Sequence, residues 1–183
     1  MQRLIFFLVW LILVSPCRAE IIIVDDDGPA DFNNIQAAIE YSSDWDTIYV
    51  FPGIYTGPGN RDIDFLGKVI TVQSVAPDDP YIVAETIIDC NASASDKHRG
   101  FIFQSAEDGN SVLAGFTIIN GYETVGGGIY SNWSSPTITN CVITGNTGRG
   151  GGIACEDAYP TISNCTISYN NGLPRGGGHL LRL

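Results

Sequence analysis

The sequence repeats one block near its carboxyl-terminal end, which begins with Gly126-Gly127-Gly128-Ile129 and returns 24 residues later as Gly150-Gly151-Gly152-Ile153. Within the block, Pro136-Thr137-Ile138-Thr139-Asn140-Cys141 returns as Pro160-Thr161-Ile162-Ser163-Asn164-Cys165, and a third copy starts at Gly176-Gly177-Gly178. Each copy alternates with a period of two, is rich in β-branched residues and contains glycine turns but no helical stretch. So short a repeat predicts a β-solenoid, in which neighbouring copies stack to bury their faces.

The repeat continues in a weaker form toward the amino terminus. Gly115-Phe116-Thr117-Ile118 aligns with Asn140-Cys141-Val142-Ile143 of the first regular copy. The apolar side chains of Ile35, Ala38 and Ile39 have the i, i+3, i+4 spacing of a short helix, of about three turns, which would cap the first coil. Strands are expected over residues 21–24, 47–51, 68–75, 86–89, 101–103 and 112–119.

Residues 1–19 have the pattern of a secretion signal. Arg3 precedes the apolar run Leu4–Val14, and small residues then predict cleavage before Glu20. The run is far shorter than the roughly 20 residues that a membrane-spanning helix needs. We therefore expect an exported protein without a transmembrane helix in the mature chain, whose residues 20–183 form a single domain.

The charge of the chain excludes several partners. The net charge is −11 at pH 7, and loss of Arg3 and Arg18 with the signal makes it two units more negative. Nucleic acids and anionic membranes bind basic patches, so neither is an expected partner. Calcium and a solvated extracellular surface are both compatible with so acidic a chain.

Four cysteines follow the signal, and an even number in an exported chain suggests disulfides. Cys141 and Cys165 hold the same register in the repeat, so they are expected to stack about 4.8 Å apart inside the solenoid. Parallel side chains are poorly oriented for a disulfide, which favours buried thiols. The disulfide state of Cys90 and Cys155 stays open.

Carboxylates are the first candidates for chemistry. Hydrolysis of a glycosidic bond needs two carboxylates about 5–10 Å apart, yet the few acids of the regular coils do not recur at the repeat spacing. We therefore assign no catalytic residue. Asp25-Asp26-Asp27 is the densest acidic cluster, which predicts either a calcium-binding loop or a solvated turn. No other cofactor is expected.

Exposed aromatic rings are the second candidate. Tyr130, Trp133 and Tyr159 all lie in the repeat region, and exposed rings provide a flat apolar face against which a sugar can stack. The alternative is that the turns display a few rings without a ligand.

The chain resembles a known family in several motifs. Its first part is similar to the amino-terminal cap and first coil of pectin lyase-like, right-handed parallel β-helix proteins, and its Gly-Gly-Gly-Ile and Ile-x-x-Asn pairs resemble the repeats of polymorphic outer membrane proteins. The motifs that carry the first resemblance are Val24-Asp25-Asp26-Asp27, Ile35-Gln36-Ala37-Ala38-Ile39, Asp46-Thr47-Ile48-Tyr49-Val50 and Pro52-Gly53-Ile54-Tyr55.

The resemblance implies a right-handed parallel β-helix with three strands per coil. In the copy at 126–149 the strands would be 128–130, 137–139 and 141–143, with Ile129, Ile138, Cys141 and Ile143 pointing inward. It also implies ladders of stacked side chains, which pair Asn140 with Asn164, Asn146 with Asn170 and Cys141 with Cys165.

The superfamily contains lyases, hydrolases, adhesins and structural proteins, so the resemblance leaves the activity open. We expect an exported, non-enzymatic β-helix repeat protein of the cell surface or extracellular space, which contacts a polysaccharide or cell-surface glycan. The alternative is a polysaccharide lyase or glycoside hydrolase whose catalytic coils are missing or degenerate. The tail His179–Leu183 departs from the repeat, which suggests that the sequence is a truncated copy of a longer β-helix.

Overall fold

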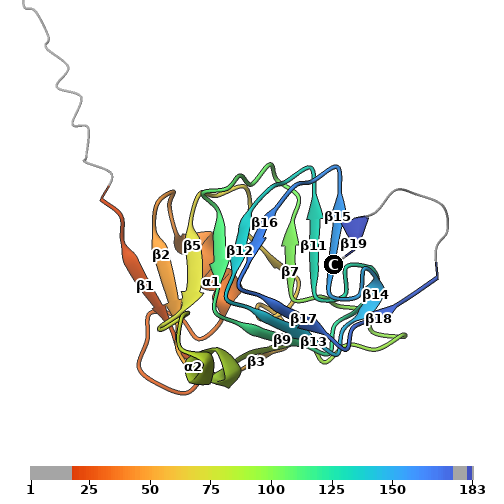
Figure 1. Cartoon of the computed structure of the whole chain (residues 1–183). Helices are drawn as coiled ribbons and strands as arrows, with labels where there is room; N and C mark the ends of the chain where they lie inside the picture. The colour runs from red at the N-terminus through yellow and green to blue at the C-terminus, as the bar shows by residue number, and fades with distance from the viewer. Residues whose placement is uncertain (1–17, 175–180, 183) are drawn as a thin grey trace, which may run out of the picture.

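The computed structural model of the chain describes residues 18–174 and 181–182. Short parallel strands wind into a solenoid, and the strands of successive coils align into sheets that run along its length (Figure 1). Most of the expected secretion signal, the start of the third repeat copy and most of the tail lie outside the described residues. Neither helix in the described part has the length and hydropathy to span a bilayer.

Within the described residues, the strands form four sheets, which are the walls of the solenoid. The first sheet contains β1 (Ile21–Val24), β2 (Thr47–Val50), β5 (Thr71–Ser74), β8 (Val112–Ala114), β12 (Thr137–Thr139) and β16 (Thr161–Ser163). The second contains β3 (Gly53–Thr56), β6 (Thr86–Asp89), β9 (Thr117–Ile119), β13 (Val142–Thr144) and β17 (Thr166–Ser168). The third contains β4 (Ile63–Asp64), β7 (Phe101–Phe103), β11 (Ile129–Asn132), β15 (Ile153–Glu156) and β19 (Leu181–Arg182), the last antiparallel to β15.

The fourth sheet is short and adds to the three strands expected per coil. It contains β10 (Tyr122–Val125), β14 (Thr147–Arg149) and β18 (Asn171–Gly172), which lie between the second and third sheets along the chain. Gly148 has the backbone of Glu123 and Gly127 within 3.4 Å of where a Cβ would be. None of these strands was among those expected from the sequence, because strands of two to four residues carry little periodic signal.

The register of the strands follows the repeat. Ile129 pairs with Ile153, Ile138 with Ile162 and Ile143 with Ile167, each in a parallel ladder. The alignment of Thr117 with Val142 also holds. Ile129, Ile138, Cys141 and Ile143 are all buried, whereas their neighbours along the strands are partly exposed. The predicted all-β fold and its inward face are therefore confirmed.

The helix α1 (Ile35–Tyr41) caps the first coil, as predicted, but spans only seven residues. Asn34 begins it by accepting a hydrogen bond from the Ala37 N–H. The side chains of Ile35, Ala38 and Ile39 form the buried face of the helix. The helix is shorter than predicted because Lys68 Nζ donates hydrogen bonds to the carbonyls of Ile39, Glu40 and Ser42 at its carboxyl-terminal end. The last carbonyls of a helix have no partner within it, and here Lys68 satisfies them in place of a further helical turn.

A second helix, α2 (Pro80–Glu85), was not predicted from the sequence. Asp79 is its N-cap and Pro80 opens it, a combination typical of helix starts. Six residues are too few to show a helical period, so the segment looked like part of a loop. The helix packs on the outer side of β6 and β9, where Thr117 Oγ1 donates to the Val83 carbonyl.

Candidate functional site

The turns that join the third sheet to the first display two of the three aromatic residues singled out in the sequence, Trp133 and Tyr159. Residues 104–111 join β7 to β8, 133–136 join β11 to β12, and 157–160 join β15 to β16. Because the flanking strands pair in register, these turns stack on one another and form one corner of the solenoid. We call this set of turns the corner.

Trp133 and Tyr159 project from neighbouring coils of the corner. Trp133 is 70% exposed and Tyr159 is 84% exposed. Each is fixed through its backbone: the Trp133 N–H donates to the Glu156 carbonyl, and the Tyr159 N–H donates to Ser135 Oγ, both at 3.1 Å. Trp133 also has a φ of 51°, in the left-handed region, which costs a bulky L-residue about 1–3 kcal/mol. Neither core packing nor backbone preference explains this ring.

Glu107 holds the corner in place, and sequence reasoning missed it. Its buried carboxylate accepts hydrogen bonds from the Gly67 N–H at 2.8 Å, the Ser105 N–H at 2.9 Å and Ser134 Oγ at 2.8 Å. These donors come from three successive coils. A single carboxylate thus connects three turns and fixes the one that contains Trp133, and charge-assisted bonds of this kind are the stronger ones. Glu107 occurs outside the regular repeat, so no periodic signal identified it.

Tyr130 has a different environment from the other two rings. It lies half-buried on β11, its hydroxyl donates to Glu156 Oε2 at 2.6 Å, and the Arg99 guanidinium lies 4.9 Å from the centre of its ring. Burial and the hydrogen bond to Glu156 raise the pKa of Tyr130 to about 12. One face of this ring is therefore already occupied by Arg99, and the residue is not part of the corner.

A charged cluster surrounds Tyr130. Arg99 pairs with Glu123 and Arg149 with Glu156, both at 3.8 Å, and burial lowers the pKa of Arg99. Nearby, His98 lies between two aspartates, with Nδ1 at 2.5 Å from Asp62 and Nε2 at 3.1 Å from Asp96. The sequence gives no sign of the contact with Asp62, because Asp62 lies 36 residues from His98 along the chain.

The acidic loop Asp25-Asp26-Asp27 lies at the other end of the solenoid, after β1. Its carboxylates bring one oxygen each within 4.8 Å of one another, a spacing that a divalent cation could bridge. Asp26 and Asp27 are exposed, and Asp25 accepts a hydrogen bond from the Asp27 N–H at 3.3 Å. The Asp25 carboxylate thus also stabilises the loop as a turn, and we assign the loop no function.

The asparagine pairs of the repeat behave differently from one another. Nδ2 of Asn146 donates to Asn170 Oδ1 at 3.1 Å, and Nδ2 of Asn170 donates to the Ile143 carbonyl at 2.8 Å. Asn140 and Asn164 occupy matching turns, with φ of 55° and 52°. The amide of Asn140, however, donates to Asp78 Oδ1 at 2.7 Å.

Cys141 and Cys165 stack in neighbouring coils with free thiols. The Cys141 N–H donates to Cys165 Sγ at 3.5 Å, and Cys90 and Cys155 are free thiols as well. The hydrogen bond from the Cys141 thiol lowers the pKa of Cys165, while the same bond and burial raise that of Cys141.

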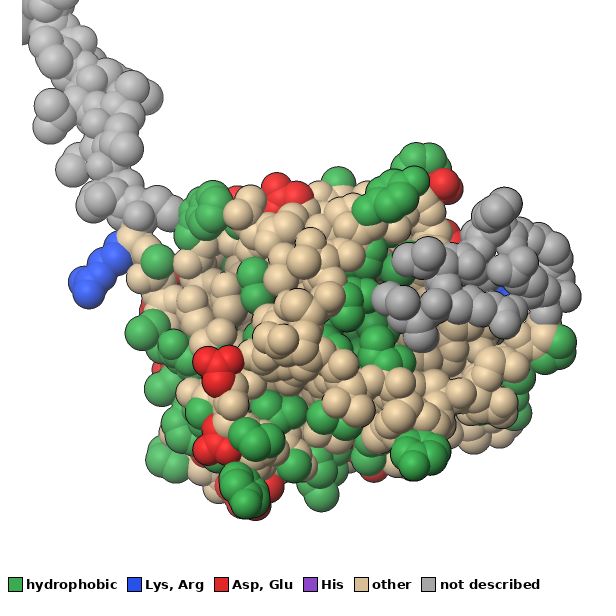
Figure 2. Space-filling view, viewed as in Figure 1, with side chains coloured by type: hydrophobic (Ala, Val, Ile, Leu, Met, Phe, Trp, Pro, Cys, Tyr) green, Lys and Arg blue, Asp and Glu red, His purple; other side chains and the backbone are tan. Residues whose placement is uncertain are grey.

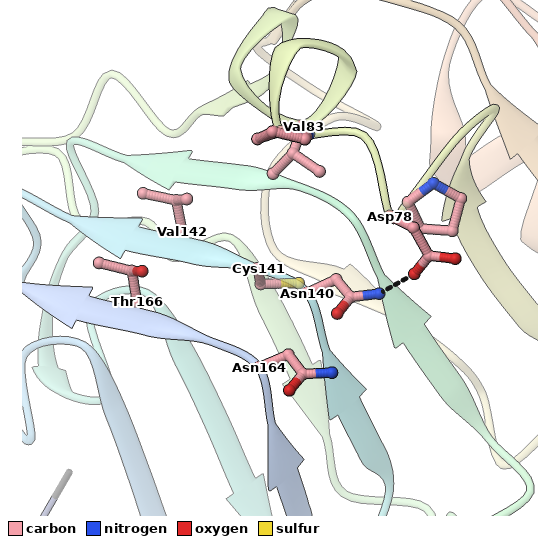
Figure 3. A pocket seen from close by; sticks show the side chains of 9 residues that line it. Asp78, Val83, Asn140, Cys141, Val142, Asn164 and Thr166 are labelled. Atoms are coloured by element: carbon pink, nitrogen blue, oxygen red, sulfur yellow. Dashed lines mark hydrogen bonds between the residues drawn. The ribbon is translucent and has the colours of Figure 1, made fainter.

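A groove of about 410 Å³ lies between α2 and the outer face of β13 and β17 (Figure 3). Asp78, Asn140, Asn164 and Thr166 provide its polar lining, and Val83 and Val142 are among its apolar residues. The bond between Asp78 and Asn140 crosses one end of the groove. The groove is shallow and open, and its polar groups do not converge on one point.

Comparison with known proteins identifies the family. Residues 71–181 match the family described as a right handed beta helix region, and the chain therefore belongs to this family of β-helix proteins. The resemblance drawn from the sequence to right-handed parallel β-helix proteins is confirmed. No curated protein and no solved structure matches the chain.

Proposed function

We propose that the chain is an exported, non-enzymatic β-helix protein that contacts glycans at the cell surface or in the extracellular space. The observation that carries the proposal is the exposed ring of Trp133, held in a strained turn with Tyr159 on the next coil. The strained, exposed ring of Trp133 supports a binding role because packing does not account for it and a second exposed ring, Tyr159, lies on the next coil of the same corner. The apolar run Leu4–Val14 supports export.

Polysaccharide binding by matched variants tests the proposal. Trp133→Ala and Tyr159→Ala should each weaken binding to an immobilised polysaccharide panel about tenfold, equal to about 1.4 kcal/mol. Tyr169→Ala is the matched control, because Tyr169 is 93% exposed in a left-handed turn but lies between β17 and β18, away from the corner. Equal binding by all three variants and the native chain would refute the glycan-binding role.

The non-enzymatic part of the proposal has its own test. The purified chain is incubated with polygalacturonate, with and without calcium, and new reducing ends and unsaturated products are measured. We expect neither. Product formation under either condition would favour the lyase or hydrolase alternative, and the calcium dependence would then direct attention to Asp25-Asp26-Asp27.

A further inference from the structure

The corner continues along the whole solenoid. Residues 65–70 join β4 to β5, and residues 42–46 join α1 to β2. The strands that follow all the corner turns pair in register, so the five turns lie on one edge. Hydrogen bonds connect the added turns as well, since the Trp45 N–H donates to the Val69 carbonyl and the Gly67 N–H donates to Glu107.

The added turns also expose large apolar side chains. Trp45 is 61% exposed and Leu66 is 47% exposed. With the two rings described above they make a set of four, which we call the corner stripe: Trp45, Leu66, Trp133 and Tyr159. Figure 2 shows separate hydrophobic side chains along the upper edge of the molecule, over the turns that join the third sheet to the first.

The backbone of the stripe is strained in three of its four members. Trp45 has a φ of 75°, Leu66 of 59° and Trp133 of 51°. The turn geometry explains why φ is positive, because Ala106 and Asp157 share it in other coils. It does not explain the choice of side chain, since Gly, Asn or Asp would occupy such positions at lower cost. Bulky apolar residues therefore occupy three of these positions despite both solvent exposure and strain.

The spacing of the stripe suits a linear polymer. Adjacent coils lie about 4.8 Å apart, so five turns extend over about 19 Å parallel to the solenoid axis. The apolar groups are separated by exposed polar side chains, namely Asp44, Gln104, Asp108, Asn110 and Asp157. A protein interface has a fully buried apolar core surrounded by a polar rim, whereas the four side chains of the stripe come from four different coils and have exposed polar groups around them. Separate apolar groups among hydrogen-bonding groups instead match a chain of sugar units, each with an apolar face and hydroxyl edges.

The charges near the stripe indicate which polysaccharide it suits. Lys68 is the one basic residue in the five turns, and its Nζ is bound to three carbonyls at the end of α1. The exposed charged groups of these turns are the carboxylates of Asp44, Asp108 and Asp157. A uronic acid polymer would meet like charge without a cation to neutralise it.

We propose that the corner stripe is one continuous track for an uncharged polysaccharide chain lying parallel to the solenoid axis. This inference rests on the glycan-binding role proposed above, and it adds Trp45 and Leu66 to the ligand-contacting residues. It also sets the ligand class: a long neutral polymer, rather than a single terminal sugar or an acidic polysaccharide.

Chain-length dependence tests the track. Binding of hydroxyethyl cellulose, xylan and galactomannan is measured by affinity electrophoresis, with polygalacturonate as the acidic polymer, and two- and six-unit oligosaccharides of the best polymer are measured by calorimetry. Trp45→Gly and Trp45→Asn both suit a positive φ and should fold. Both variants should weaken polymer binding about tenfold. They should leave the binding of the two-unit oligosaccharide at Trp133 unchanged. Tyr81→Ala, an exposed ring on α2, is the control.

The outcomes separate the two proposals. Normal polymer binding by both Trp45 variants, with weakened binding by Trp133→Ala, would overturn the continuous track and leave the glycan-binding role intact. Polymer binding that none of these substitutions weakens would overturn both. Tighter binding of polygalacturonate than of every neutral polymer, or binding of no neutral polymer, would overturn the ligand class.

Discussion

At the scale of single residues, the stacked cysteines have unlike environments although they are equivalent in the repeat. Cys141 is fully enclosed, whereas Cys165 is partly exposed because its coil is the last of the regular coils in the described part of the chain. The hydrogen bond from Cys141 favours the thiolate of Cys165 and lowers its pKa. Burial instead raises the pKa of Cys90 to about 12 and that of Cys155 to about 11.

These differences predict selective alkylation. At neutral pH, iodoacetamide should modify Cys165 well before the other three thiols, because the thiolate is the reactive form. The rate at Cys165 should fall as the solution is acidified, since protonation removes the thiolate. Mass spectrometry of peptides from a time course measures each site, with urea-unfolded protein as the control. Faster labelling of Cys90 or Cys155 in the folded chain would contradict the assignment.

At the scale of elements, inward and outward residues alternate along the strands, and the inward ones form the hydrophobic core. Ile138 on β12 is buried between Leu113 on β8 and Ile162 on β16, its register partners. Thr137, one residue away, faces outward and is partly exposed. Ile162 itself is only partly buried because β16 ends its sheet in the described part of the chain.

A charge placed at each position should separate the two faces. Ile138→Asp should unfold the coil or reduce the free energy of unfolding by more than about 4 kcal/mol, because it buries an unpaired carboxylate. Thr137→Asp should cost about 1 kcal/mol, for the lost hydrogen bond to the Gly109 carbonyl. Urea denaturation followed by circular dichroism measures both. Equal losses would mean that the inward and outward faces are assigned wrongly.

Much of this strand arrangement could be predicted from the sequence because the same pattern occurs in two successive copies of the repeat. The strand registers around Ile129 and Ile143 and the paired turns of Asn146 and Asn170 all follow from a 24-residue period. The corner stripe could be predicted only in its last two coils. Trp45 and Leu66 lie in irregular coils of different length, where only the folded register shows that they share an edge with Trp133.

At the scale of the whole molecule, strands differ in how many neighbouring strands they have along the solenoid axis. Strands such as β8 and β9 are hydrogen-bonded on both sides, whereas β16, β17 and β18 have one neighbouring strand each in the described part of the chain. Ile162, Cys165 and Ile167 are correspondingly only partly buried, although their counterparts one coil earlier are enclosed.

Hydrogen exchange should reveal this gradient. Amides of β16, β17 and β18 should exchange faster than those of β8 and β9, because opening one ladder requires less free energy than opening two. Exchange measured by mass spectrometry on native protein resolves the peptides, and the helix-capped strands β1 and β2 serve as an internal comparison. Equal protection of β16 and β8 would show that the last coil is covered in solution.

The hydrogen bond between Asp78 and Asn140 should affect how the solenoid unfolds under mechanical force. An ideal solenoid behaves as a one-dimensional stack, in which each coil interacts only with the next. Here the segment after β5 crosses over Gly115, where a Cβ would lie 2.6 Å from the Cα of Pro77, and joins a turn 62 residues along the chain. This segment therefore contacts the coil that contains β8 and also links the coil before it to the coil after it. Under force applied from the carboxyl-terminal side, these three coils should therefore yield together as one mechanical unit, rather than unzip one at a time.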